Sequence, residues 1–353
     1  MEEKTTNLIP KYFLAANTYT GFVSYFDKLF NSQDFDRIFI LKGGPGTGKS
    51  SFIKKLSRKF FENECSIEEI YCSSDPHSLD GVTIAKDNKR VAIIDGTAPH
   101  ERDAKIPGAI EELINLGDGW DERFLTSRKD EILMLSNEKA ASYKTAYFYL
   151  SIAGKAHELI TNYYKAGFDK IKSKTKAEII LKDIFPSSVN IQIKLISSFG
   201  RYGTYSLSTL TDIAKKVIKI GGNALSSSLF LDECYNTAVS KNIRLVRFPS
   251  ALDPNNTDAL YFPEIGLALI RSSQGEINAN DYIKVTDVDS ERMRIAEVLH
   301  SDALEESKRW FAIASDVHFR LEEIYGGAMD FEKNNEILNK KIKQIENILE
   351  IHR

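Results

Sequence analysis

Eight residues, Gly43-Gly-Pro-Gly-Thr-Gly-Lys-Ser50, constrain the fold of this chain more than any other segment. They match G-x-x-x-x-G-K-[ST], a glycine-rich loop whose backbone N–H groups wrap an anionic phosphate. The apolar run at residues 37–41 is typical of a strand buried on both faces, and residues 49–63 carry apolar side chains at helical spacing. Because strand, loop and helix follow one another in this order, we predict a P-loop at the N-terminus of a helix.

Further strands are predicted at residues 67–72 and 91–94, shortly after the helix. Short strands joined by crossovers indicate a mostly parallel α/β sheet of the P-loop NTPase type. Beyond Trp120 the pattern becomes helical. Residues 143–160 predict a long amphipathic helix, and residues 169–183 predict another.

The second half of the chain repeats this plan. Gly221-Gly222 lies 178 residues after Gly43-Gly44, and four further matches keep this offset without a gap. Ser228 matches Ser50, Phe230 matches Phe52, Asp253-Pro254 matches Asp75-Pro76, and Asp258 matches Asp80. We therefore predict the P-loop-like unit twice, each followed by long helices, with domains at residues 1–186 and 187–353.

Less regular matches extend the repeat over both halves. Residues 267–270 stand where residues 91–94 stood, and residues 189–196 read as a strand that opens the second unit as residues 11–15 open the first. On the long helices, His318 and Tyr325 repeat His157 and Tyr164. A stripe from Phe331 to Leu349 predicts a terminal helix, either a short coiled coil or a helix packed on its own domain.

The second copy lacks the chemical groups of the first. Ala224, Ser226 and Ser227 replace Gly46, Gly48 and Lys49, and Arg271 replaces Asp95. A hydroxyl cannot replace an ammonium, and a fixed cation would repel Mg²⁺. We expect a degenerate repeat that keeps the fold without the site.

The first copy has a full set of candidate groups for ATP and Mg²⁺. Lys49 is expected to reach the β- and γ-phosphates, and Ser50 to offer its hydroxyl to Mg²⁺. Asp95 ends a buried strand and either shares the metal or caps the Gly-Thr turn that follows; Thr97 either senses the γ-phosphate or only turns the chain. The predicted nucleotide-binding residues are Gly43, Gly44, Pro45, Gly46, Thr47, Gly48, Lys49, Ser50 and Ser51.

Hydrolysis also needs a residue that orients water, and no glutamate follows Asp95. Asp75 and Glu101 are the candidates, so the predicted catalytic set is Lys49, Asp95, Asp75 and Glu101. Asp75-Pro76 persists in the degenerate copy, which favours a turn-forming role for Asp75. Arg102, Arg123 and Arg128 are weaker candidates, as groups that neutralise the charge of the transition state. His157 and His318 lie on apolar helix stripes, which favours an interpretation as core histidines over one as ligands.

The composition bears on which classes of binding partner and which cellular compartment we expect. With 353 residues, 42% hydrophobic and 27% charged, the chain is long enough for two globular domains. A formal charge of −3 gives no general basic surface for nucleic acid, and three scattered cysteines favour a reducing compartment. The start, Met-Glu-Glu-Lys, is unlike a signal peptide, and no apolar run approaches the roughly 20 residues of a membrane span. We expect a cytoplasmic protein without a membrane partner.

Taken together, these motifs resemble a poorly characterised bacterial family of predicted ATPases built from two tandem P-loop repeats. The resemblance implies ATP binding and names no substrate. In that family the second loop also ends in Gly-Lys-Ser/Thr, and this chain departs there. The segments that carry the resemblance are residues 37–50, Cys72-Ser-Ser-Asp-Pro-His-Ser-Leu-Asp-Gly81, Ile93-Ile-Asp-Gly-Thr-Ala-Pro-His100 and residues 107–118.

Three functions remain open from the sequence. The first is a Mg²⁺-dependent ATPase with a non-catalytic second repeat. The second is a small-molecule or nucleotide kinase, in which Asp75 or Asp80 holds the acceptor and residues 101–128 close as a lid. The third is a nucleotide-switched protein whose helical arms report ATP to a protein partner. GTP is the least supported nucleotide, because the chain has no Asn-Lys-x-Asp signature.

Overall fold

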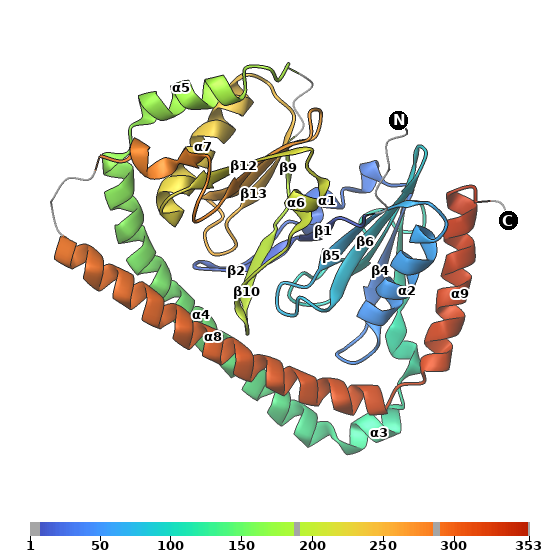
Figure 1. Ribbon diagram of the computed structural model, residues 1–353. Coiled ribbons are helices and arrows are strands. Elements are labelled where there is room, and N and C mark those ends of the chain that lie inside the picture. Colours follow the sequence, from blue (N-terminus) through green and yellow to red (C-terminus); the bar gives the residue numbers. More distant parts are fainter. Residues whose placement is uncertain (1–7, 187–190, 285–289, 352–353) are drawn as a thin grey trace.

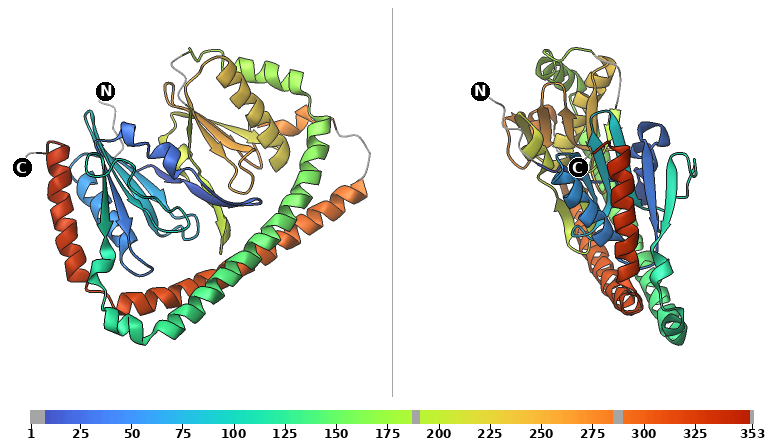
Figure 2. Two further views of the ribbon diagram at one scale, coloured as in Figure 1. Left: turned by 180° about the vertical axis from the view of Figure 1, so that it is seen from behind. Right: turned by 90° about the vertical axis from the view of Figure 1, so that its right-hand side faces the viewer.

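The computed structural model describes residues 8–186, 191–284 and 290–351. Two six-stranded sheets lie side by side, and a pair of long helices runs beneath both of them (Figure 1). The same arrangement is visible from behind and from the side (Figure 2). This is an α/β fold with two sheet-and-helix units, as the sequence predicts.

The first sheet has the order β1-β5-β6-β7-β4-β8. Strand β4, next to the edge strand β8, pairs in parallel with β7 and β8, and β1 pairs in parallel with β5. Only β6 is antiparallel to both neighbours, so the sheet is mixed but mostly parallel. Sequence analysis did not predict β6, which forms a hairpin with β7. The strands are β1 (Lys11–Phe13), β4 (Arg37–Lys42), β5 (Ser66–Tyr71), β6 (Leu79–Lys86), β7 (Lys89–Asp95) and β8 (Glu111–Asn115).

The second sheet has the same order and the same strand directions, β9-β13-β14-β15-β12-β16. Even the register irregularity is repeated, between Ile70 and Tyr71 in the first sheet and between Phe248 and Pro249 in the second. The first two residues of the strand expected at residues 189–196 lie outside the described residues. The strands are β9 (Ile191–Ile193), β12 (Lys216–Gly221), β13 (Leu245–Pro249), β14 (Thr257–Phe262), β15 (Leu267–Arg271) and β16 (Ile277–Asn278).

The two sheets share a core through their facing surfaces. Ile38 and Ile40 from the first sheet join Ala259 and Ala268 from the second in one buried cluster. A hairpin beside each sheet adds to the junction, β2 (Ala15–Thr18) with β3 (Gly21–Ser24) and β10 (Ser197–Gly200) with β11 (Gly203–Ser206). The short helices nearby are α1 (Phe26–Leu29), η1 (Ser32–Asp34) and α6 (Thr209–Ile213).

Helices α2 (Lys49–Phe61) and α7 (Ala224–Ser240) follow the equivalent strands β4 and β12. The long helices α4 (Lys129–Gly167) and α8 (Ser290–Gly327) pack together, and the Ser307 hydroxyl donates a hydrogen bond to Ala146 O at 2.9 Å. The remaining helices are η2 (Leu116–Gly119), α3 (Glu122–Ser127), α5 (Lys170–Ile180), η3 (Ala279–Tyr282) and α9 (Phe331–Ile348). No helix in the described part of the chain is long and apolar enough to cross a membrane.

The repeats exchange their last helices. Ala177 on α5 joins the core around Phe230 in the second unit, whereas Leu338 and Ile345 on α9 join the core around Phe52 in the first. The long helices carry each terminal helix from its own sheet to the other one (Figure 1). The boundary near residue 186 therefore separates two sequence repeats, and each spatial unit is completed by a helix from the other repeat.

Candidate functional site

The glycine loop connects the end of β4 to the start of α2. Gly46 has φ 68° and Gly48 has φ 84°, values that glycine adopts without strain and other residues rarely adopt. The loop thus enters α2 with a left-handed turn at Gly48, and Lys49 is the first helical residue. The N–H groups of the first helical turn and the positive end of the helix dipole would both face an anion bound at this place.

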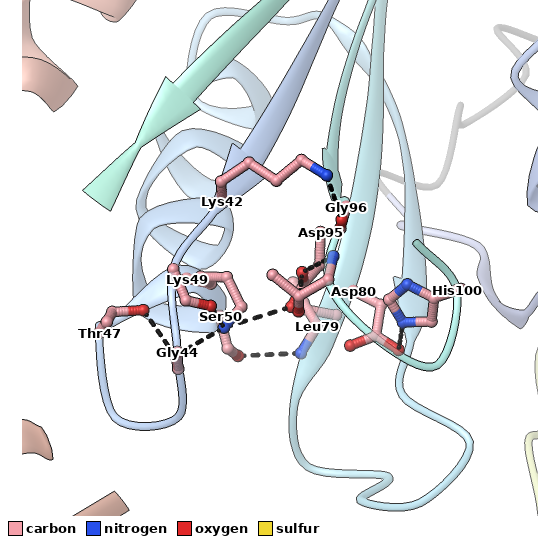
Figure 3. Close-up of polar contacts among 12 residues, drawn as sticks. Lys42, Gly44, Thr47, Lys49, Ser50, Leu79, Asp80, Asp95, Gly96 and His100 are labelled. Atoms are coloured by element: carbon pink, nitrogen blue, oxygen red, sulfur yellow. Dashed lines mark hydrogen bonds and ion pairs between the residues drawn. The ribbon is translucent and has the colours of Figure 1, made fainter. Parts of the chain in front are cut away.

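Lys49 is held at the mouth of the loop (Figure 3). Its Nζ donates hydrogen bonds to Gly43 O and Gly44 O, both at 2.9 Å, and lies 3.7 Å from Oδ2 of Asp95. Thr47 Oγ1 also donates to Gly44 O, at 2.9 Å, which ties the two sides of the loop together. The ammonium is therefore pre-positioned between loop and strand.

Asp95 is the last residue of β7 and lies opposite Leu41 of β4. Its Oδ1 accepts hydrogen bonds from the Thr97 N–H at 2.9 Å and the Thr97 hydroxyl at 2.6 Å, while Oδ2 faces Lys49. Burial raises the pKa of the Asp95 carboxyl, and Lys49 opposes this rise. Asp95 therefore caps the turn with one oxygen and presents the other to the loop, so the two sequence-based interpretations are compatible.

A second carboxylate, Asp80 on β6, lies in the same site. Its Oδ2 is 3.2 Å from Nε2 of His100 (Figure 3). The His100 ring also stacks on Phe26, with 4.6 Å between the ring centroids. Burial alone would lower the pKa of His100, but the hydrogen bond and charge of Asp80 raise it above its usual value. Sequence analysis considered Asp80 only as an acceptor-binding residue and missed His100, because β6 itself was not predicted.

Ser50 and Asp95 offer the oxygen donors that suit Mg²⁺. Ser50 Oγ accepts the Leu79 N–H at 2.9 Å, which leaves a second lone pair on the hydroxyl oxygen. Mg²⁺ usually binds one or two carboxylates together with substrate phosphates and water. Because the described residues contain no cluster of three or more His, Cys, Asp or Glu side chains that could hold a metal, the fit depends on a bound phosphate.

The remaining predicted residues are either held by other hydrogen bonds and ion pairs or exposed. Asp75 Oδ1 accepts the His77 N–H at 3.1 Å, a turn that Asp253 repeats with Asn255 at the same distance. Glu101 is exposed and lines a hollow whose lining includes no residue of the glycine loop. Ser51 is exposed in the first turn of α2. Of the three candidate arginines, Arg102 is buried and pairs with Glu111 and Asp27, Arg128 pairs with Glu131, and Arg123 lies exposed in α3.

Helices α8 and α9 from the second repeat cover the loop. A Cβ atom on Gly46 would lie 2.4 Å from Glu322 O, and one on Gly44 would lie 3.7 Å from the Tyr325 ring, both on α8. Asn334 on α9 donates a hydrogen bond to Thr47 O at 2.8 Å, in a buried position. The loop glycines therefore also allow a close approach of the second repeat.

His318 lies under this cover and not in a closed core, so its interpretation as a core histidine is corrected. It is half-buried, with Nε2 at 3.6 Å from Oε1 of Glu322. Burial lowers the pKa of His318 to about 4, with further contributions from Lys139 and Lys49. The imidazole is thus neutral near pH 7, and its contact with Glu322 is polar rather than an ion pair.

We compared the chain with models of known families, with curated proteins and with solved structures. None of them matches. The resemblance to tandem P-loop ATPases stays a prediction, and the function of the site rests on its own residues.

The second repeat does not form a comparable loop. Helix α7 begins at Ala224, so the residues that correspond to Gly46 and Gly48 are helical. The buried Ser227 hydroxyl donates to Gly221 O at 3.2 Å, where the first repeat has the ammonium of Lys49. In the second repeat, an earlier start of helix α7 therefore takes the place of the glycine turn that precedes α2 in the first.

Proposed function

We propose that the chain binds ATP with Mg²⁺ at residues 43–51 and hydrolyses it. One observation carries the proposal. The Lys49 ammonium is held between the loop carbonyls and the buried Asp95 at the N-terminus of α2. A cation, free helix N–H groups and a nearby carboxylate are the groups that a triphosphate with its metal requires.

Each group of the site has a distinct proposed role. The loop N–H groups and Lys49 bind and orient the phosphates, and Lys49 compensates the negative charge that develops on the leaving oxygen. Ser50 and Asp95 would hold Mg²⁺, which supplies further charge compensation when bound. Thr97 keeps Asp95 in place through its two hydrogen bonds. The second repeat has no complete loop of its own, and its helices α8 and α9 cover the loop of the first repeat.

Phosphate release from the purified chain tests this proposal. With Mg²⁺ and ATP alone, the wild type is expected to release phosphate well above Lys49→Ala. Lys59→Ala, which removes a lysine farther along α2, serves as the matched control and should behave like the wild type.

Other outcomes would assign a different function. Release equal to Lys49→Ala, restored by a metabolite that becomes phosphorylated, would identify a kinase. The lid expected for a kinase has little support, because residues 101–128 include β8, which is hydrogen-bonded to β4. Tight nucleotide binding without any release would identify a nucleotide-switched interaction protein.

A further inference from the structure

One carboxylate beside the loop comes from the other repeat. The α8 backbone at Glu322 approaches Gly46 so closely that a Cβ atom there would lie 2.4 Å from Glu322 O. The Glu322 side chain is half-buried, and its Oε1 lies 3.6 Å from Nε2 of His318. Residue 322 of α8 therefore lies against the first repeat's P-loop, and it carries a carboxylate.

The charges around this carboxylate are those of the proposed site. Burial, and then the charge of Asp75, raise the pKa of the Glu322 carboxyl. Lys49, the Gly46 N–H and Lys139 oppose this rise. The Glu322 carboxyl thus lies in the electrostatic surroundings of Lys49 and Gly46, two residues of the proposed phosphate site, and the contact of its backbone with Gly46 agrees with this position.

The degenerate repeat provides an internal comparison. The offset that relates His157 to His318 also relates Thr161 to Glu322, so α4 presents a threonine where α8 presents a carboxylate. Ile160, next to Thr161, packs with Leu225 at the start of α7, so α4 covers the degenerate site as α8 covers the intact one. Thr161 Oγ1 is buried and has no hydrogen-bond partner among the described residues.

The covering carboxylate is therefore present only where the P-loop lysine and the metal carboxylate are present. Both repeats keep the contact between a long helix and this region. If that contact were the only role of the residue, a carboxylate would not be needed in the first repeat alone. The two residues expected from the sequence to orient water are less suitable. Asp75 holds a turn that the degenerate repeat also keeps, and Glu101 is an exposed residue of a hollow whose lining includes no residue of the glycine loop.

We propose that Glu322 is a catalytic residue, donated by the second repeat, that orients and deprotonates the attacking water at the P-loop. This proposal rests on the proposed ATPase function and extends it. Water bonds to the γ-phosphorus through its oxygen while Glu322 accepts a water proton. The bond between the γ-phosphorus and the β–γ bridging oxygen breaks, and its electron pair leaves with ADP. The products are ADP and inorganic phosphate, and the carboxyl returns its proton to solvent.

The test compares Glu322→Gln with Glu323→Gln, which changes the exposed next residue on the same helix. Single-turnover hydrolysis of Mg²⁺·ATP is measured together with the affinity for a non-hydrolysable ATP analogue and the thermal unfolding midpoint. A general base typically contributes about 10²–10⁴-fold, so Glu322→Gln should lower the rate at least about 10²-fold. Affinity should stay equal or become tighter, because a negative charge beside the phosphates is removed. Glu323→Gln should match the wild type, and Glu322→Asp should recover part of the rate.

Two outcomes with an active wild type would overturn the role of Glu322 alone. In one, Glu322→Gln hydrolyses at the wild-type rate and binds more tightly, which would make the carboxylate only an anionic competitor for the loop. In the other, affinity and rate fall together, which would make it a structural or ligand-binding group. If the wild type neither binds nor hydrolyses ATP, the proposed function fails, and the proposal for Glu322 fails with it.

Discussion

The guanidinium of Arg271 forms two contacts with the carboxylate of Asp258, Nε to Oδ1 and Nη2 to Oδ2, each at 3.1 Å. This pair stands where the first repeat has Asp95 beside Asp80, since strands β14 and β15 repeat the register of β6 and β7. Arg271 donates one hydrogen bond to Asp258 and forms a second ion-pair contact with it, so it compensates the charge of the aspartate that both repeats keep and occupies the place of Asp95. One repeat therefore has two carboxylates beside a loop, and the other has a closed ion pair beside a helix.

Because Arg271 and Asp258 pair with each other in the second repeat, we expect one nucleotide to bind per chain, at the first repeat. Loss of a hydrogen bond from a charged group costs on the order of 1.5–3 kcal/mol, and the second repeat lacks the loop and the metal carboxylate as well. Calorimetric titration with a non-hydrolysable ATP analogue should show one site, strongly weakened by Lys49→Ala. Two sites, or a single site that Lys49→Ala leaves intact, would contradict this assignment.

Asp95→Asn should fold normally and turn over ATP much more slowly. The amide keeps the oxygen that Thr97 contacts but loses the charge that shares Mg²⁺ with Ser50. Loss of a metal carboxylate removes several kcal/mol of transition-state stabilisation, so we expect a rate lower by about 10²-fold or more. The control is Asp103→Asn, which removes an exposed carboxylate that pairs with Lys42. Steady-state turnover at saturating Mg²⁺ gives the answer, and a rate near that of the wild type would exclude Asp95 as a metal ligand.

Acid should destabilise the protein through His300. Burial lowers the pKa of His300 from 6.5 to about 4, the charge of His157 adds to this, and its Nε2 lies 2.7 Å from the Tyr19 hydroxyl. A depressed histidine pKa means that the unfolded chain binds the proton more tightly, so the unfolding free energy falls as pH drops from about 6.5 towards 4. Denaturant unfolding at about pH 7 and pH 5 should show a smaller loss for His300→Gln than for the wild type. Equal losses would show that His300 does not titrate in this window.

The exchange of helices can be tested through Ile345. This side chain is fully buried on α9 in the core of the first sheet, far along the chain from that sheet. Truncation of a buried isoleucine leaves a cavity, so Ile345→Ala should lower the unfolding free energy by about 2–5 kcal/mol. Lys343→Ala, on the exposed side of the same helix, should stay within about 0.5 kcal/mol of the wild type. Similar small effects for both variants would show that α9 does not complete the first core.

Patterns that are local in the chain predicted much of the fold. The strand before the loop, helix α2, and the long helices follow from short runs of apolar residues, and the constant offset between repeats predicted two equivalent units. Strand β6 escaped prediction because residues 79–86 follow a turn-rich segment. Its apolar residues gain their burial from pairing with β5 and β7, which no local pattern reveals.

By itself, the sequence determined the glycine loop between strand β4 and helix α2, the carboxylate at the end of the buried strand β7, and the loss of both in the second repeat. Each of these features lies within a short stretch of the chain, so residue type and spacing specify it. Only the tertiary structure decided that Asp80 and His100 join Asp95, that α5 and α9 exchange between sheets, and that Glu322 faces Gly46. These relationships depend on how two sheets pack face to face and on the length of two paired helices. They arise from contacts between segments that are distant in the chain. Burial of apolar surface favours these contacts, and this burial is complete only when the whole chain has folded.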